Sequence, residues 1–441
     1  MRFSDWAKKA PNGKAIVLDI DGTLVSAGQW APPPGVVAAV ERLKKDNDVF
    51  LFSNKNIPTR NGKVAEALDV PLLDSSAKKP FPRVLENLPS EKPLVVVGDK
   101  FLTDGLLAYF TGSEFVHVAR VSGTGEPLMD KTINAVDDAF WYTWNLFLLL
   151  RPGQWVKNVL VFAPLFFARR FLEDGLLGQA MAAFVAFCFL ASAGYCINDL
   201  QDRLADALHP RKRFRPIASG AVPPLLALIF AALLVLVAAL IIATYIPAVA
   251  LLAALYLLSS FLYSAYLKRV PVLEMLFFVW FYLARTLAGG LAVSVPISSW
   301  LILAIVFLAL FLVCAKRYAE SRSGRSRAVL AYYPEYFLQG MLVLSAALVV
   351  VFYALYTVLG LSLPGHLGVL AEAGVAGAAF PLAVYSTLPV LGAIMRYLQL
   401  SFGHTSDNTS AVEYPEKLIL KDPGLLLAAL AWLAMMVAVF Y

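Results

Sequence analysis

Two patterns of hydrophobic positions divide the chain. In the first 140 or so residues, short apolar runs alternate with polar and amphipathic stretches. From about residue 155 onward, apolar runs long enough to cross a bilayer recur, and short polar loops separate them. The first pattern is typical of a soluble domain and the second of a membrane domain. We therefore predict a soluble domain over residues 1–130, an interfacial linker helix over residues 131–152 and a membrane domain over residues 153–441.

Four short runs of β-branched and apolar residues in the N-terminal part are predicted to be strands. Stretches with the period of a helix lie between them, such as PPGVVAAVERLKKD at residues 33–46. This alternation predicts an α/β domain around a mainly parallel sheet, whose functional groups should gather at the carboxyl ends of the strands. The predicted strands are residues 16–21, 49–54, 94–99 and 115–120.

Four motifs follow one another at or near the ends of these strands. They are LDIDGTLV at residues 18–25, Ser53-Asn54, Lys79-Pro80 and GDKFLTDG at residues 98–105. In combination and in this order they resemble the haloacid dehalogenase (HAD) superfamily of phosphatases, and the resemblance covers nearly the whole N-terminal domain. It implies a Rossmann-like parallel sheet and Mg²⁺-dependent hydrolysis of a phosphomonoester.

The resemblance also implies a role for each polar residue of these motifs. Asp19 would attack the phosphorus, and Asp21 would protonate the leaving oxygen and then activate water. The first motifs are too close for a large cap domain between them, so an open site for a bulky or membrane-bound phosphate ester is expected. A docking module without turnover is the alternative. The other implied roles are phosphoryl contacts by Ser53, Asn54 and Lys79, and a Mg²⁺ site formed by Asp19, the main-chain carbonyl of Asp21, Asp99 and a supporting Asp104.

The C-terminal part is predicted to be an all-α polytopic membrane domain of about nine transmembrane helices. Lys and Arg concentrate in the loops after the second, fourth, sixth and eighth of these helices. Basic loops face the cytoplasm, so we expect an integral inner-membrane protein whose N-terminal domain and active sites are cytoplasmic. The predicted helices are centred near residues 162, 187, 233, 257, 281, 308, 350, 390 and 432.

Composition narrows the class of protein further. Hydrophobic residues make up 59% of the 441 residues and charged residues only 15%, which excludes a soluble globule. The net charge of +6 suits an anionic leaflet and anionic substrates. Because the basic residues cluster at the ends of membrane helices, we expect no nucleic-acid partner. The three cysteines lie in or beside apolar runs and predict no disulfide framework, and a homo-oligomer is compatible with these features.

An acidic triad followed by a basic cluster stands at the end of the second predicted membrane helix. Asp199, Asp202 and Asp206 are spaced so that a helix would place them on one face. Neighbouring carboxylates repel one another unless a divalent cation neutralises them, so we predict a Mg²⁺ site that holds a diphosphate. A solvated loop with topology-setting charges would explain the basic residues but not the triad. The cluster expected to contact phosphate consists of Arg211, Lys212, Arg213 and Arg215.

Five runs in the C-terminal part resemble the UbiA superfamily of intramembrane transferases: RPGQWVKN, residues 198–220, YSAYLK, AKRYAE and YPEKLILKD. Within it, the resemblance is to the branch that transfers phosphoribosyl groups to polyprenyl phosphate of the decaprenyl type. A user of prenyl diphosphate should carry a second aspartate-rich cluster, whereas here Glu274 stands where related sequences usually have aspartate. Cations predominate instead and suit a sugar phosphate and a lipid phosphate, although some could serve only topology. The expected substrate contacts are Lys157, Asn198, Tyr263, Lys268, Lys316 and Arg317.

Together the two resemblances imply a bifunctional membrane enzyme with Mg²⁺ in both domains. The membrane domain would transfer 5-phosphoribose from phosphoribosyl diphosphate to polyprenyl phosphate, and the HAD-like domain would then remove the 5-phosphate. The alternative is a prenyltransferase that joins a polyprenyl diphosphate to an aromatic acceptor, with the HAD-like domain a separate phosphatase or a docking module.

Overall fold

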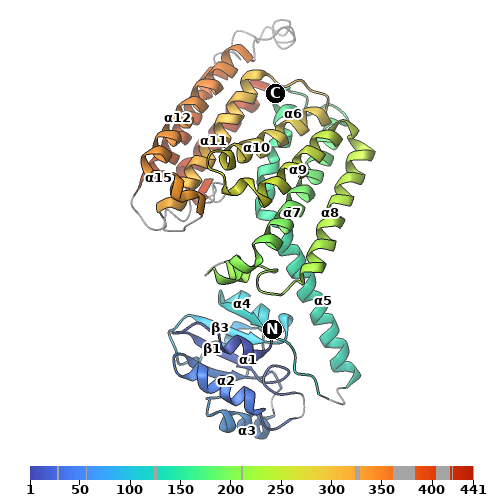
Figure 1. Cartoon of the computed structure of the whole chain (residues 1–441), viewed down its shortest axis with the longest axis vertical. Coiled ribbons are helices and arrows are strands. Elements are labelled where there is room, and N and C mark those ends of the chain that lie inside the picture. Colours follow the sequence, from blue (N-terminus) through green and yellow to red (C-terminus); the bar gives the residue numbers. More distant parts are fainter. Residues whose placement is uncertain are drawn as a thin grey trace. The chain divides into compact units, whose positions relative to one another are not determined.

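The computed structural model describes residues 1–26, 29–55, 57–123, 127–209, 212–322, 328–360, 383–403, 418–419 and 421–440. Contacts within the chain divide it into two compact units. The first contains Met1–Leu148 and Pro210–Pro223, and the second contains Leu149–His209 and Pro224–Tyr441. Figure 1 shows a sheet with helices in the first unit and long helices in the second.

A four-stranded parallel sheet forms the centre of the first unit, in the order β2-β1-β3-β4. This confirms the predicted parallel sheet. In the register, Asp19 at the end of β1 lies opposite Phe52 at the end of β2, and Gly98 of β3 lies opposite His117 of β4. The carboxyl ends of the strands therefore meet at one edge. The strands are β1 (Ala15–Asp19), β2 (Asp48–Phe52), β3 (Leu94–Gly98) and β4 (Glu114–His117).

Strand β1 is buried along its whole length because both faces of the sheet are covered. Its side chains alternate between two apolar clusters, as a strand requires. Ile16 and Leu18 pack in the cluster that includes residues of α1 and α2, and Ala15 and Val17 pack against Phe50 and neighbouring side chains. The helical elements are α1 (Phe3–Ala7), α2 (Pro34–Lys44), α3 (Pro58–Leu68), η1 (Pro82–Leu85), η2 (Phe101–Gly105) and α4 (Leu106–Thr111).

Helix α5 (Leu128–Leu150), of which the part up to Leu148 belongs to the first unit, contacts η2 and β4. The carboxylate of Asp137 accepts hydrogen bonds from the backbone N–H groups of Phe101 and Leu102, at 2.8 and 2.7 Å. The ring of Trp141 stacks on His117, with 4.3 Å between centroids. These contacts fix the helix beside the ends of β3 and β4.

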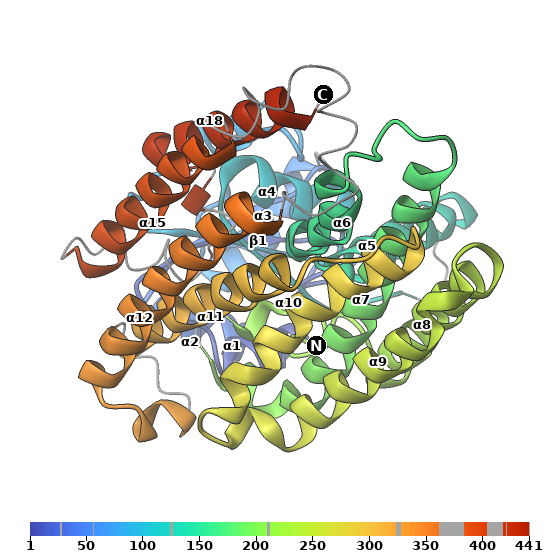
Figure 2. The ribbon, with the colours of Figure 1, turned by 90° about the horizontal axis from the view of Figure 1, so that it is seen from above.

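The second unit is all-helical, and α10 lies between two groups of helices (Figure 2). One apolar cluster joins α10 to α7, α8 and α9, and another joins it to α11, α12 and α15. The elements are η3 (Pro152–Phe162), α6 (Ala163–Phe167), α7 (Leu176–Leu208), α8 (Pro224–Tyr245), η5 (Pro247–Val249), α9 (Ala250–Ala265), η6 (Leu267–Arg269), α10 (Leu273–Ala292), α11 (Ser299–Arg322), η7 (Ala328–Tyr332), α12 (Glu335–Leu355), η8 (Tyr356–Gly360), α15 (Thr387–Phe402) and α18 (Pro423–Phe440); η4 (Lys212–Phe214) belongs to the first unit.

Seven helices among the described residues are long and apolar enough to cross a membrane, compared with about nine predicted from the sequence. Near residue 162 the chain forms the 3₁₀ segment η3 and the short helix α6 instead of one long helix. Near residue 390, α15 has 16 residues, fewer than a straight span requires. The seven apolar helices agree with an integral membrane protein.

Candidate functional site

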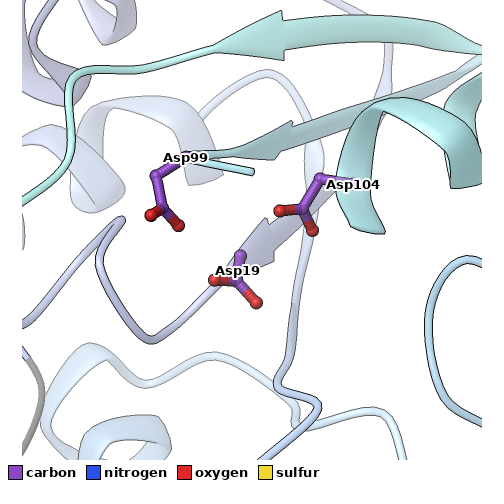
Figure 3. A group of neighbouring side chains, drawn as sticks. All are labelled: Asp19, Asp99 and Asp104. Carbon is purple, nitrogen blue, oxygen red and sulfur yellow. The ribbon is translucent and has the colours of Figure 1, made fainter. Parts of the chain in front are cut away.

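Three buried carboxylates gather at the strand edge of the first unit. Asp19 ends β1, Asp99 follows β3, and Asp104 lies in the π-helical turn η2. Each offers an oxygen within 4.8 Å of those of the other two, and Figure 3 shows the carboxylates turned toward one another. Hard oxygen ligands in such a group suit Mg²⁺. In the described part of the chain, no other group of three or more His, Cys, Asp or Glu side chains has metal-binding spacing.

We call Asp19, Asp99 and Asp104 the strand-end cluster. Lys79 supplies the positive charge beside it. Its Nζ lies 2.5 Å from Oδ1 of Asp19 and 2.5 Å from Oδ1 of Asp104. Asn54 fixes the lysine, because its Oδ1 accepts the Lys79 backbone N–H at 2.8 Å and its Nδ2 donates to the Lys79 carbonyl at 3.1 Å. Asn54 thus positions Lys79 in this structure, while the role predicted for it was a phosphoryl contact.

Burial and charge act in opposite directions on the strand-end cluster. Desolvation raises the pKa of Asp19 well above its ordinary value, against the attraction of Lys79. Burial alone would lower the pKa of Lys79, but Asp104 and Asp19 together raise it, so the amine stays cationic. A divalent ion would favour the ionised form of Asp19 and offset the cost of its burial.

Asp21 contacts two residues outside the strand-end cluster, Ser53 and Arg60. Its Oδ2 accepts a hydrogen bond from Oγ of Ser53 at 2.8 Å, and its Oδ1 pairs with Nη1 of Arg60 at 2.7 Å. Arg60 is buried and its Nε donates to the Gln29 carbonyl. Asp21 is therefore held in one orientation beside the strand-end cluster, and Arg60 is a site residue that the sequence did not reveal.

Asp99 is held by two neighbours from distant parts of the chain. Nε of Arg120 lies 2.6 Å from its Oδ2, and Oγ1 of Thr23 lies 3.3 Å from its Oδ1. Burial raises the pKa of Asp99, and Arg120 opposes that shift. Gly22 has a φ of +79°, and a Cβ at this position would come within 2.6 Å of the Asp99 carboxylate. Only glycine fits this turn without displacing Asp99.

The predicted acidic triad of the second unit lies on α7, where its carboxylates are not within metal-binding distance of one another and two of them are paired with cations. Both oxygens of Asp199 lie 2.6 Å from Nη2 of Arg151. Oδ1 of Asp202 lies 2.6 Å from Nζ of Lys268. Asp206 is buried near the end of the helix. Arg151 and Lys268 thus supply part of the neutralisation that we had expected from a divalent ion alone.

The other residues of the second unit that were predicted to contact substrate lie on different elements. Lys157 lies in η3, and its Nζ donates to Oε1 of Gln154 at 2.6 Å. Asn198 is half-buried on α7, next to Asp199. Tyr263 packs against the ring of Phe278, and the Lys316 ammonium lies 5.8 Å from the centroid of that ring.

Arg317, for which a substrate contact was predicted, lies in a buried ion-pair network, and the substrate contact stays a prediction. It is fully buried, and its Nε and Nη2 lie 2.7 and 2.5 Å from the two carboxylate oxygens of Glu274. Its Nη1 lies 2.5 Å from Oε2 of Glu320. Because two glutamates already use its donors, we assign Arg317 to an internal ion-pair network. The same pairing gives Glu274 a role that the sequence left open.

The basic cluster after α7 is described in part. Arg211 lies outside the described residues, and Lys212, Arg213 and Arg215 belong to the first unit. Nη2 of Arg213 lies 3.5 Å from Oε1 of Glu114, and its guanidinium lies 4.6 Å from the centroid of the Phe214 ring.

Four arginines of these surroundings were not predicted as site residues. Arg60, Arg120 and Arg151 hold Asp21, Asp99 and Asp199 respectively. Arg285 lies within α10, where its Nε lies 2.5 Å from Oδ1 of Asn158. Each stands in a segment whose pattern gives no sign of the pairing, except that Arg151 opens the RPGQWVKN run.

Comparisons with known proteins show the family to which the chain belongs. The chain belongs to the UbiA prenyltransferase family, whose model matches residues 159–390. It is 37% identical over 294 residues to decaprenyl-phosphate phosphoribosyltransferase of Mycobacterium tuberculosis, covering 65% of this chain and 90% of the relative. It is 35% identical over 308 residues to the protein of that name from Mycolicibacterium smegmatis, covering 67% and 92%. A UbiA homolog from Archaeoglobus fulgidus bound to GPP and Mg²⁺ covers 67% of this chain and 99% of its own, with 18% identity and a TM-score of 0.49.

Proposed function

We propose that the protein transfers 5-phosphoribose from phosphoribosyl diphosphate to a polyprenyl phosphate and then removes the 5-phosphate, giving polyprenyl-phosphoryl-ribose. The observation that carries the first step is the similarity to decaprenyl-phosphate phosphoribosyltransferases over about two thirds of the chain, which includes α7 and its carboxylates. The strand-end cluster of the first unit supports the second step.

In the transferase step, Asp199, Asp202 and Asp206 would hold Mg²⁺, which would supply Lewis-acid stabilisation of the departing diphosphate. The oxygen donors on α7 fit this ion by their chemistry. Arg151 and Lys268 have long side chains that can leave the carboxylates and bind the phosphate oxygens that arrive. Arg151 and Lys268 would then bind the diphosphate, and the carboxylates would be free to bind the metal.

The acceptor chemistry explains why cations predominate around α7. As the bond from C1 of the sugar to the diphosphate oxygen breaks, a phosphate oxygen of the lipid forms the new bond to C1. The acceptor is already an anion, so no general base is required. Lys157 and Lys316 are the proposed contacts for the lipid phosphate and the sugar 5-phosphate, with Asn198 and Tyr263 beside them and Arg211, Lys212, Arg213 and Arg215 as further phosphate contacts.

In the phosphatase step, a carboxylate oxygen of Asp19 attacks phosphorus and the bond to the sugar oxygen breaks. Asp21 gives the leaving oxygen a proton. It later takes a proton from the water that attacks phosphorus, so that the bond between phosphorus and Asp19 breaks and phosphate leaves, and Ser53 fixes the orientation of Asp21. Asp19, Asp99 and Asp104 would hold Mg²⁺, which would offset charge on the phosphoryl group, and Lys79 adds to that effect. We propose that both sites face the cytoplasm, because Lys and Arg concentrate in the loops on that side.

Membranes that contain the full chain test the proposal with labelled phosphoribosyl diphosphate and polyprenyl phosphate. The wild type should form a lipid-linked pentose without its 5-phosphate, and Asp199→Asn should slow formation by at least about 10²-fold. Asp174→Asn, an exposed carboxylate in the turn before α7, is the matched control. A prenylated aromatic acid in a parallel assay, with no lipid-linked pentose, would establish the prenyltransferase alternative instead.

A further inference from the structure

A small cavity opens beside the strand-end cluster, and α5 forms one of its walls. Asp21 and Asp99 line it from the ends of β1 and β3, and Arg120 lines it from the segment after β4. Asp130 and Asn134 line it from α5. These two residues are four positions apart, so they lie on the same face of the helix. The cavity thus joins the proposed reaction centre to a helix that none of the predicted catalytic motifs includes.

Ion pairs and hydrogen bonds hold this wall in place. Nζ of Lys55 lies 3.3 Å from Oδ2 of Asp130, and Nη1 of Arg120 lies 3.3 Å from Oδ2 of Asp138. One turn away from Asn134, Asp137 accepts two backbone N–H groups of η2, the turn that carries Asp104. The side of α5 that faces the cavity is therefore positioned by contacts on both sides of Asn134.

Asn134 is the polar group of this wall that the protein leaves incompletely paired. The residue is 9% exposed, and its buried Oδ1 has no hydrogen-bond donor among the described residues. Buried acceptors are nearly always paired, because leaving one unpaired costs free energy. Asn134 lines the cavity, so a small turn of its side chain would let this acceptor bind a ligand that brings an O–H donor.

We propose that the leaving group of the phosphatase reaction places one sugar hydroxyl in this cavity and that Asn134 binds this hydroxyl. The proposal rests on the phosphatase step above and names its substrate class: phosphate esters of a polyhydroxylated alcohol, such as a pentose 5-phosphate. Alkyl and aryl phosphates lack the hydroxyl and would leave Oδ1 unpaired. A site built to bind a hydroxyl discriminates strongly against analogues without it. Helix α5 then serves as the selective wall of a site that has no large inserted cap.

The full chain in detergent with Mg²⁺ tests this with two soluble substrates, ribose 5-phosphate and 4-nitrophenyl phosphate. Asn134→Ala should lower kcat/KM for ribose 5-phosphate about tenfold, mainly through KM, and change that for 4-nitrophenyl phosphate less than about twofold. Asn134→Leu, of similar size to asparagine, should do the same. Asn145→Ala is the matched control, because Asn145 lies on α5 outside the cavity lining and bonds its own helix at the Trp141 carbonyl.

Equal losses on both substrates would overturn the proposal in favour of a purely structural role for Asn134. Unchanged selectivity in both Asn134 variants would overturn it as well. Absence of turnover of both substrates by the wild type, at the level of Asp19→Asn, would instead refute the phosphatase step and the inference with it. Turnover by the wild type with unchanged selectivity in the variants refutes only the inference.

Discussion

The two acidic groups of this protein are built in different ways. Asp19, Asp99 and Asp104 come from three separate segments, and the packing of the sheet brings their oxygens within 4.8 Å of one another. Asp199, Asp202 and Asp206 share one helix, where seven residues rise by about 10 Å. The strand-end cluster is therefore preformed by the fold. On α7 the carboxylates hold cationic side chains, so we expect the substrate to complete that site.

The largest expected effect concerns the preformed group. Asp19→Asn removes the proposed nucleophile, so we expect the lipid product to accumulate with its 5-phosphate while the first step continues. The second step should slow by at least about 10³-fold, since covalent catalysis has no substitute there. Mass spectrometry of the lipids measures both species. The exposed Asp46→Asn serves as the control, and a dephosphorylated product at the wild-type rate would mean that the first unit does no chemistry on this lipid.

Removing the cation from each group should sharpen the comparison. Lys79→Met leaves Asp19 and Asp104 buried without their shared partner, so the free energy of unfolding of the first unit should fall by about 3–5 kcal/mol. Hydrogen exchange of the β1 amides in the full chain measures this loss. Lys45→Met, at an exposed position, should change it little. Unchanged protection in Lys79→Met would show that the strand-end cluster is not held together by charge.

The corresponding change on α7 should alter metal binding more than stability. Arg151 is partly exposed, so Arg151→Met should leave the fold intact and release Asp199. We expect Mg²⁺ to bind about tenfold more tightly without diphosphate, because it no longer competes with the guanidinium, and sugar transfer to slow by about the same factor. Calorimetric titration measures the first quantity. Equal metal affinity in variant and wild type would contradict the proposed exchange of cations.

The smallest effect concerns pH and the contact between α5 and the sheet. Burial lowers the pKa of His117 despite the neighbouring Asp99, so the ring is stable in the fold as the neutral form. The unfolded chain takes up a proton near pH 6.5 and the folded chain only at lower pH. Stability should therefore fall as pH drops from about 7, with a slope of at most about 1.4 kcal/mol per pH unit. His117→Phe keeps a ring beside Trp141 and should flatten this profile in thermal unfolding.

Local sequence patterns predicted those strands and helix faces whose formation depends on residues close together in the sequence. The apolar run that ends at Asp19 predicts a buried strand, and the spacing from Asp199 to Asp206 predicts a shared helix face. The pairing of Arg120 with Asp99 was hidden, because it depends on how β3 and the segment after β4 are placed together. Hydropathy also cannot separate a long helix from η3 followed by α6, since both are equally apolar.

The network of Arg317 with Glu274 and Glu320 bears on how the protein enters the bilayer. Glu274 lies in the first turn of α10 and Arg317 near the end of α11, and six residues join the two helices. Each charge alone would be costly in hydrocarbon, whereas the paired charges shield one another. We therefore expect α10 and α11 to leave the insertion machinery together as a hairpin. Biogenesis of this protein would then depend on the pairing of Arg317 with Glu274.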